Sequence, residues 1–238
     1  MQELSDENRR TISANLAKVR IKIAEAAIRV GRSPDEVQLV AVTKTQSAAV
    51  IPHLLAEGIT AIGESRPEII VKKQESLGED ISWHMIGHFQ RKKIAKSLPH
   101  LGVIHSVHCL ELLSSLDHAA GQLSDEKKPV EIMIQVNVAQ EAQKQGFHVG
   151  DIQDVCDLAG AFTRLKLRGL MTMAPRQVEK DKARQVFRTL RTIRDKIGVE
   201  NVPELSMGMS DDYEMAIEEG ATIVRIGSVL FDGLDMDR

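Results

Sequence analysis

The sequence is poor in aromatic residues and in net charge. Phe, Trp and Tyr make up 3% of the 238 residues, with a single Trp and a single Tyr. Proteins that stack single-stranded nucleic acid use several aromatic side chains, and proteins that bind polyanions carry an excess of positive charge. Here the formal net charge is -3 and the pI is near 6.3. We therefore expect no nucleic-acid partner.

Cysteines and long hydrophobic runs are also scarce. Cys109 and Cys156 are the only cysteines, and without a CxxC motif they do not form a disulfide framework. No window approaches the roughly 18 consecutive apolar residues of a membrane-spanning helix. The first ten residues, MQELSDENRR, lack the apolar core of a signal peptide. The sequence predicts a cytoplasmic protein with no membrane partner.

The histidines form two close pairs, His84 with His88 and His105 with His108. Zinc sites need three or four converging ligands, and neither pair has a cysteine or a carboxylate at a suitable spacing. We therefore expect no metal. The glycine-rich nucleotide loops and the GxSxG motif of hydrolases are absent as well.

What the sequence does contain is a regular alternation of two hydrophobic periods. Short runs rich in Val, Ile, Leu and Met alternate with stretches whose apolar residues are three and four apart, which predicts strands alternating with helices. A further helix, with Ile12 and Leu16 on its apolar face, comes before the first strand. The predicted strands cover residues 37–42, 59–63, 81–87, 102–107, 130–138, 165–173, 203–209 and 221–227.

This alternation predicts an α/β protein with a parallel sheet. Nearly continuous apolar runs are typical of parallel strands covered on both faces, and a doubly wound open sheet would fit them too. The count of eight and the absence of a linker favour a single (β/α)8 TIM-type barrel over residues 1–238, with an extra N-terminal helix. Such a barrel typically needs about 250 residues.

Catalysis and binding in such barrels take place at the carboxyl ends of the strands. Lys44 directly follows the first predicted strand. An amine partly shielded from water at that position is a nucleophile toward carbonyl groups. A lysine that ends a strand also commonly does no more than reach solvent. Lys44 is therefore a candidate that needs support from other residues.

The loops after the seventh and eighth strands give that support. Met209 and Ser210 lie between a glycine turn and a predicted helix, where a hydroxyl and free N–H groups can bind an anion. Plain capping of the helix by Ser210 explains the same residues. After the eighth strand, Gly227 permits close backbone approach and Ser228 offers a hydroxyl. In many barrels these two loops together bind phosphate.

Seven motifs follow one another along the chain: LVAVTKTQ (39–46), IGES (62–65), WHMIGHFQRKK (83–93), VNVAQEAQKQGF (136–147), RGLMTMAP (168–175), LSMGMSDDYEMAI (205–217) and VRIGSVLF (224–231). In this order they resemble the motifs of one protein family, the pyridoxal phosphate homeostasis proteins. The resemblance covers essentially the whole chain. It implies a pyridoxal 5'-phosphate (PLP) barrel of fold type III, similar to the N-terminal domain of alanine racemase.

The resemblance implies roles for particular residues. Lys44 corresponds to the lysine that holds PLP as a Schiff base. Ser210, with Met209 beside it, corresponds to the serine that binds the cofactor phosphate, and Gly227 and Ser228 correspond to the phosphate-binding pair after the eighth strand.

Two further positions concern the pyridine ring of the cofactor. Arg225 corresponds to the arginine that faces the pyridine nitrogen, although the residue type alone equally allows an ion pair inside the barrel. A guanidinium there keeps the nitrogen unprotonated and makes the ring a weaker electron sink. The family usually has Asn on the hydroxyl side of the ring, where this chain has Ser65.

Three functions fit these residues. The first is a PLP-binding protein that serves PLP and amino-acid homeostasis without a dedicated reaction, is a monomer and has PLP-dependent apoenzymes as candidate recipients. The second is an amino-acid racemase, which needs acid and base groups on both faces of the cofactor. In alanine racemase one of them is a Tyr from a further domain, and the only Tyr here, Tyr213, is expected to pack in a helix. The third is a Schiff-base aldolase with a bare lysine. We favour the first.

Overall fold

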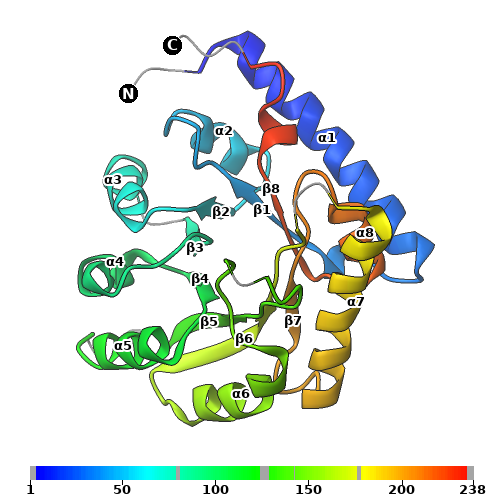
Figure 1. Ribbon diagram of the computed structural model, residues 1–238. Coiled ribbons are helices and arrows are strands. Elements are labelled where there is room, and N and C mark those ends of the chain that lie inside the picture. Colours follow the sequence, from blue (N-terminus) through cyan, green and yellow to red (C-terminus); the bar gives the residue numbers. More distant parts are fainter. Residues whose placement is uncertain (1–3, 79–80, 124–128, 142, 176–177, 235–238) are drawn as a thin grey trace.

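The computed structural model describes residues 4–78, 81–123, 129–141, 143–175 and 178–234, and within them eight parallel strands close into a barrel (Figure 1). The strands follow one another around the barrel in sequence order, and β1 pairs with β8 to close it. The predicted barrel is confirmed, and the open sheet is excluded. The strands are β1 (Gln38–Val42), β2 (Ala61–Glu64), β3 (Ser82–Met85), β4 (Val103–Val107), β5 (Val130–Gln135), β6 (Leu165–Met171), β7 (Glu204–Ser206) and β8 (Ile223–Ile226).

Helices surround the barrel, and the extra N-terminal helix is present (Figure 1). The α-helices are α1 (Asp6–Arg29), α2 (Val50–Ala56), α3 (Pro67–Leu77), α4 (Ile94–Ser97), α5 (Leu110–Ala120), α6 (Ile152–Ala161), α7 (Lys180–Ile197) and α8 (Tyr213–Glu218). Short 3-10 turns are η1 (Pro34–Glu36), η2 (Arg91–Lys93), η3 (Leu98–His100), η4 (Val149–Asp151) and η5 (Ser228–Phe231). None of the helices in the described ranges is long and apolar enough to cross a membrane.

The apolar core has two parts because successive side chains of a strand point to opposite faces of the sheet. On β1, Ala41 belongs to the large cluster between the sheet and the helices, whereas Val40 belongs to a small separate cluster. The small cluster takes one residue from each of six strands and fills the inside of the barrel. Its members are Val40, Ala61, Val103, Met133, Met171 and Ile223.

Charged side chains lie near the amino ends of β5, β6 and β7. The Arg168 guanidinium on β6 donates to the Glu131 carboxylate on β5, at 3.0 Å, and to the Glu204 carboxylate on β7. The backbones of β6 and β7 come very close here, since a Cβ added to Gly169 would lie 1.9 Å from the carbonyl oxygen of Glu204. This part of the barrel therefore combines an ion cluster with a strand contact that only glycine allows.

Helix α1 covers the seam between the first and last strands. Asn15 on α1 donates to the carbonyl oxygens of Leu230 and Asp232, at 3.3 and 2.9 Å. On its other side, Ser13 donates to the Glu57 carboxylate that follows α2, at 2.6 Å. The helix thereby ties the segment after β1 to the segment after β8.

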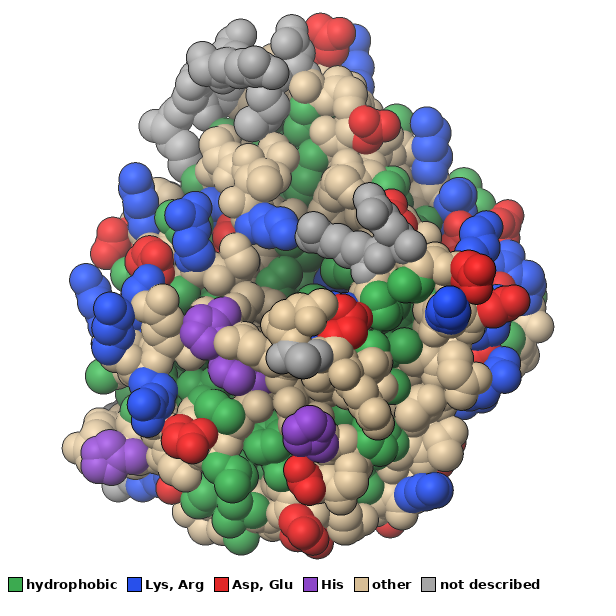
Figure 2. All heavy atoms as spheres, viewed as in Figure 1, with side chains coloured by type: hydrophobic (Ala, Val, Ile, Leu, Met, Phe, Trp, Pro, Cys, Tyr) green, Lys and Arg blue, Asp and Glu red, His purple; other side chains and the backbone are tan. Residues whose placement is uncertain are grey.

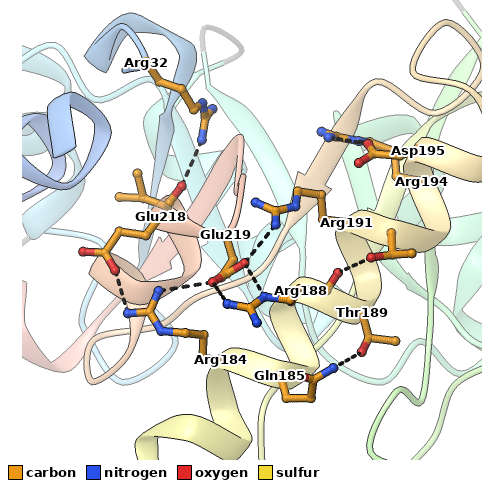
Figure 3. A network of polar contacts seen from close by, with 12 residues as sticks. Arg32, Arg184, Gln185, Arg188, Thr189, Arg191, Arg194, Asp195, Glu218 and Glu219 are labelled. Carbon is orange, nitrogen blue, oxygen red and sulfur yellow. Dashed lines mark hydrogen bonds and ion pairs between the residues drawn. The ribbon is translucent and has the colours of Figure 1, made fainter. Parts of the chain in front are cut away.

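Helices α7 and α8 are joined by an ion cluster centred on Glu219 (Figure 3). The Glu219 side chain is only 5% exposed and pairs with Arg184, Arg188 and Arg191 of α7, at 3.2, 3.0 and 3.2 Å. These arginines are three and four residues apart, so they share one face of the helix. Burial alone would raise the pKa of Glu219, but hydrogen bonds from Arg188 and Arg184 outweigh it and lower the pKa.

Replacing Glu219 by glutamine is expected to lower the free energy of unfolding by about 2 kcal/mol at pH 7, because three arginines lose their buried counter-ion while staying partly hydrated. The pKa of Glu219 is lowered from 4.5 in the folded state, so its stabilisation is present above that pH and is lost as the pH falls below it. Urea unfolding at pH 7 and at pH 3.5 measures the free energy of unfolding of the variant and of the unchanged protein at each pH.

The matched control is Asp195→Asn, which removes the exposed partner of Arg194 on the same helix (Figure 3). Exposed pairs contribute about 0 to 1 kcal/mol, so this variant should unfold almost like the unchanged protein. An equal loss in both variants, or a loss for Glu219→Gln that does not shrink at pH 3.5, would contradict the role of the Glu219 cluster.

Candidate functional site

The predicted site residues come from four strands that are neighbours in the barrel. Met209 and Ser210 follow β7, Arg225 lies on β8 with Gly227 and Ser228 after it, Lys44 follows β1, and Ser65 follows β2. Since the order around the barrel is β7, β8, β1, β2, the carboxyl ends of these strands meet at one sector of the barrel mouth. In the space-filling view, hydrophobic side chains lie at the bottom of a hollow, and Lys and Arg side chains lie on its rim (Figure 2).

The loops after β7 and β8 are joined by the Ser210 hydroxyl. Its oxygen accepts hydrogen bonds from the backbone N–H groups of Gly227 and Val229, at 3.3 and 3.5 Å. The capping alternative for Ser210 is not what the structure shows, because α8 begins at Tyr213 with Asp212 at its N-cap position. We call the Ser210 hydroxyl with the loop of Gly227 and Ser228 the phosphate cradle.

The chain reaches the cradle through a turn that requires glycine. Gly208 has a φ of +93°, and a Cβ on it would lie 2.7 Å from the Cβ of Ala216. The Asp212 carboxylate accepts a hydrogen bond from the Met209 N–H at 2.6 Å, which fixes the loop between them. Burial raises the pKa of Asp212. Asp212 is thus bound to the backbone of its own loop.

Lys44 is exposed at the mouth of the barrel, directly after buried Thr43. The partly shielded amine that the sequence suggested is therefore not observed. What is buried is the anchor of the segment before it. Lys73 on α3 donates to the Thr43 carbonyl oxygen at 2.9 Å and to the Glu64 carboxylate at 2.5 Å. This arrangement holds the end of β1 in place beneath Lys44.

The sequence analysis does not predict Lys73 as a residue that supports the site, although the sequence contains a signal for it. Pro67, Ile70 and Lys73 lie three residues apart and form the buried face of α3. A lysine at an apolar position of an amphipathic helix is either out of pattern or paired inside the protein. Here it is paired with Glu64, a residue of the IGES motif.

Arg225 is buried inside the barrel, and among the described residues no carboxylate lies within ion-pair distance of it, although the Asp212 carboxylate acts on it from further away. Its guanidinium donates to the Ser206 hydroxyl oxygen at 2.5 Å and to the Thr172 carbonyl oxygen at 3.1 Å. The ion-pair alternative for Arg225 is therefore not observed in the described part of the chain. Burial lowers the pKa of Arg225 to about 10, so the side chain is cationic at neutral pH. A guanidinium has only hydrogen-bond donors, so it favours a ligand atom that accepts a hydrogen bond.

Ser65, His88 and His108 follow the strands β2, β3 and β4 at the mouth of the barrel. Ser65 is partly buried, and its backbone is so close to Gly87 that a Cβ there would lie 2.3 Å from the Ser65 carbonyl oxygen. The rings of His88 and His108 are 5.1 Å apart. Within the described ranges no three His, Cys, Asp or Glu side chains form a group that could hold a metal ion.

The residues thus offer three kinds of chemistry within one sector. The phosphate cradle supplies a hydroxyl and the start of a short helix, which suit a phosphate group. Arg225 supplies a donor for a neutral acceptor atom, and Lys44 supplies an amine for a carbonyl carbon. A small phosphorylated carbonyl compound with a ring acceptor matches this donor set.

Comparison with known proteins places this arrangement in a class. Residues 14–235 match the family model described as alanine racemase, N-terminal domain, so the fold is that of the alanine racemase type of barrel. The pyridoxal phosphate homeostasis protein of Pseudomonas aeruginosa is 36% identical over 230 residues, which cover 94% of this chain and 96% of that protein. The chain belongs to the family of pyridoxal phosphate homeostasis proteins.

Solved structures of similar proteins agree with this class. A crystal structure of an unknown protein from Bifidobacterium adolescentis has a TM-score of 0.89 and 31% identity, covering 96% of this chain and 98% of that one. The structure of PipY from Synechococcus elongatus with PLP bound has a TM-score of 0.75 and 32% identity, covering 88% and 99% of the two chains.

Proposed function

We propose that this protein binds PLP and holds it as a Schiff base on Lys44. The observation that carries the proposal is the convergence of the phosphate cradle, Arg225 and Lys44 on the adjacent strands β7, β8 and β1. The donor set fits PLP, which has a phosphate, a pyridine nitrogen and an aldehyde. The relatives that carry a PLP-related name, and PipY with PLP bound, support the same ligand.

Each residue has one task in this proposal. Ser210, Gly227 and Ser228 bind the phosphate through their hydroxyl and N–H groups, with Met209 lining the same loop. Arg225 donates to the pyridine nitrogen, and Lys44 supplies the amine that attaches the aldehyde. Ser65 faces the ring hydroxyl side. When bound, PLP supplies an electrophilic carbon and a ring that can accept electron density.

We further propose that holding the cofactor is the function, without a dedicated reaction. Cationic Arg225 leaves the pyridine nitrogen unprotonated, which weakens the ring as an electron sink. A racemase also needs a second acid-base group, and Tyr213 is 3% exposed, with burial raising its pKa to about 12. This placement favours a packing role for Tyr213. We propose a cytoplasmic monomer that serves PLP and amino-acid homeostasis, with PLP-dependent apoenzymes as candidate recipients.

The visible spectrum of the purified protein mixed with PLP, followed by borohydride reduction and peptide mapping, tests the proposal. We expect a yellow protein with the reduced phosphopyridoxyl group on the peptide that contains Lys44. A protein that stays colourless with added PLP would contradict PLP binding and favour the aldolase with a bare lysine. Rapid interconversion of alanine enantiomers by the yellow protein would instead support a racemase.

A further inference from the structure

A row of hydrogen-bonded side chains crosses the inside of the barrel and ends on Arg225. Arg225 is 2.5 Å from the Ser206 hydroxyl, and this hydroxyl is 2.8 Å from Nδ1 of His105. Nε2 of His105 is 2.8 Å from Nδ1 of His84, and Nε2 of His84 is 3.2 Å from the Ser82 hydroxyl. We call these five residues the interior row.

The register of the sheet turns the row toward the inside of the barrel, and the row ends at Ser82, which is exposed at the start of β3. His84 pairs with Val103, and Ser206 pairs with Ile223, and both partners belong to the interior apolar cluster. Paired residues of neighbouring strands point to the same face, and residues two apart on one strand do so too. His105 and Arg225 follow Val103 and Ile223 by two positions, so they share that face.

Both histidines of the row are neutral. His84 and His105 are completely buried, and burial lowers the pKa of His84 to about 3 and that of His105 well below its ordinary value. The cations around them act in the same direction, since Arg168 faces both rings and Arg225 faces His105. The carboxylates of Glu131 and Glu204 are paired with Arg168, and the carboxylate of Asp212 acts on Arg225 at the other end of the row.

Arg225 fixes the direction of every hydrogen bond in the row. A guanidinium can only donate, so the Ser206 oxygen accepts from it. Nδ1 of His105 is the other partner of this buried hydroxyl among the described residues, so the single Ser206 proton is donated to Nδ1. A neutral imidazole carries one proton, so His105 must donate from Nε2 to Nδ1 of His84. By the same argument His84 donates from Nε2 to Ser82. In the opposite direction the Ser206 oxygen would accept from both Arg225 and His105, and its buried proton would have no acceptor among the described residues.

We propose that Ser206, His105 and His84 are positioning residues that hold the Arg225 guanidinium toward the pyridine nitrogen by a one-directional row of neutral acceptors. Because each acceptor is neutral, the row orients the guanidinium without cancelling its charge. A carboxylate at position 206 would cancel that charge. The part of this inference that concerns the ring nitrogen rests on the proposed function. The direction of the row is a property of the protein alone.

Nitrogen-15 NMR of the histidine-labelled protein without PLP tests the direction. We expect His84 and His105 both to carry their proton on Nε2 and to keep it there, uncharged, between pH 8 and pH 5. Exposed His118 in the same spectra is the reference for a ring that lies outside the row. A proton on Nδ1 of either ring, or a charged ring at pH 5, would overturn the inference.

The link to the cofactor is tested by PLP titration of Ser206→Ala. Loss of a hydrogen bond to a buried charged group should raise the Kd for PLP about tenfold or more and shift the visible absorbance of the bound cofactor. Ser206→Thr keeps the hydroxyl and should restore both. Ser106→Ala is the matched control, because Ser106 is a buried serine on β4 whose hydroxyl binds the Gly87 carbonyl oxygen outside the row.

The NMR experiment and the PLP titration test the interior row and the proposed function separately. The expected tautomers in a protein that never binds PLP would leave the row standing and overturn the function. PLP binding with an unchanged spectrum and Kd in Ser206→Ala would overturn the positioning role. Equal effects of Ser206→Ala and Ser106→Ala would also overturn it, because any buried hydroxyl would then serve.

Discussion

Replacing Lys44 by alanine is expected to abolish covalent attachment of PLP completely, with the visible absorbance of the yellow protein lost and no reduced adduct on the peptide that contains residue 44. The fold should be unaffected, because Lys44 is exposed and its side chain makes no hydrogen bond or ion pair in the described part of the chain. Surface substitutions of this kind change the free energy of unfolding by about 0.5 kcal/mol or less. Absorbance, borohydride reduction and thermal unfolding of one preparation measure all three outcomes.

Two further variants sharpen this prediction. Lys44→Arg keeps the positive charge that attracts the phosphate but cannot form the Schiff base, so it should behave like the alanine variant in the reduction experiment. Lys92→Ala removes an exposed lysine of η2 and should leave the adduct unchanged. An undiminished adduct on another lysine, such as buried Lys73, in Lys44→Ala would refute the assignment of Lys44.

Replacing Gly169 by alanine is expected to cost about 3 kcal/mol of stability or more. The added Cβ would lie 1.9 Å from the Glu204 carbonyl oxygen and 2.6 Å from its carbon, and both atoms belong to the backbone of β7. Relief requires β6 and β7 to separate, which disturbs their pairing and the contact between Arg168 and Glu204. Overpacking that shifts a backbone is among the most destabilising single substitutions. Urea unfolding followed by circular dichroism measures the loss.

Gly160→Ala in α6 is the matched control, and its expected effect has the opposite sign. Nothing lies within 4 Å of a Cβ built on Gly160, and the residue is inside a helix. Alanine there should stabilise the protein by about 0.5 to 1 kcal/mol. A small effect of Gly169→Ala, or destabilisation of equal size at Gly160, would mean that the contact between β6 and β7 relaxes easily.

The fold was predictable from the sequence because each strand carries its own signal. Every apolar run became a strand, although several strands are shorter than their runs. The run of residues 203–209 contains only β7 (Glu204–Ser206), because Met207 to Met209 turn away to form the loop before Ser210. Hydrophobicity marks burial, and a buried loop at the barrel mouth has the same composition as the strand that leads into it.

The site was predictable only in part. Lys44, Ser210 and Arg225 were named from their positions at strand ends and from the family resemblance. The interior row was not predicted, because it depends on the register of β3 against β4 and on the closure of the barrel. Its members His105 and Ser206 are 101 residues apart in the sequence. A histidine in the middle of each of two apolar strands is the signal that the sequence contains, and by itself it predicts neither the partner nor the direction of a hydrogen bond.

The position of the site at the seam between β1 and β8 also orders events during synthesis. Lys44 leaves the ribosome well before Ser210, which follows β7, and before Arg225, Gly227 and Ser228, which lie on β8 and in the turn after it. Asn15 of helix α1 bonds to Leu230 and Asp232, which are made 215 and 217 residues after it. A chain that has emerged only as far as β1 therefore has Lys44 but none of the groups that we propose to bind the phosphate. Under the proposed function, stable capture of PLP becomes possible only once the barrel has closed.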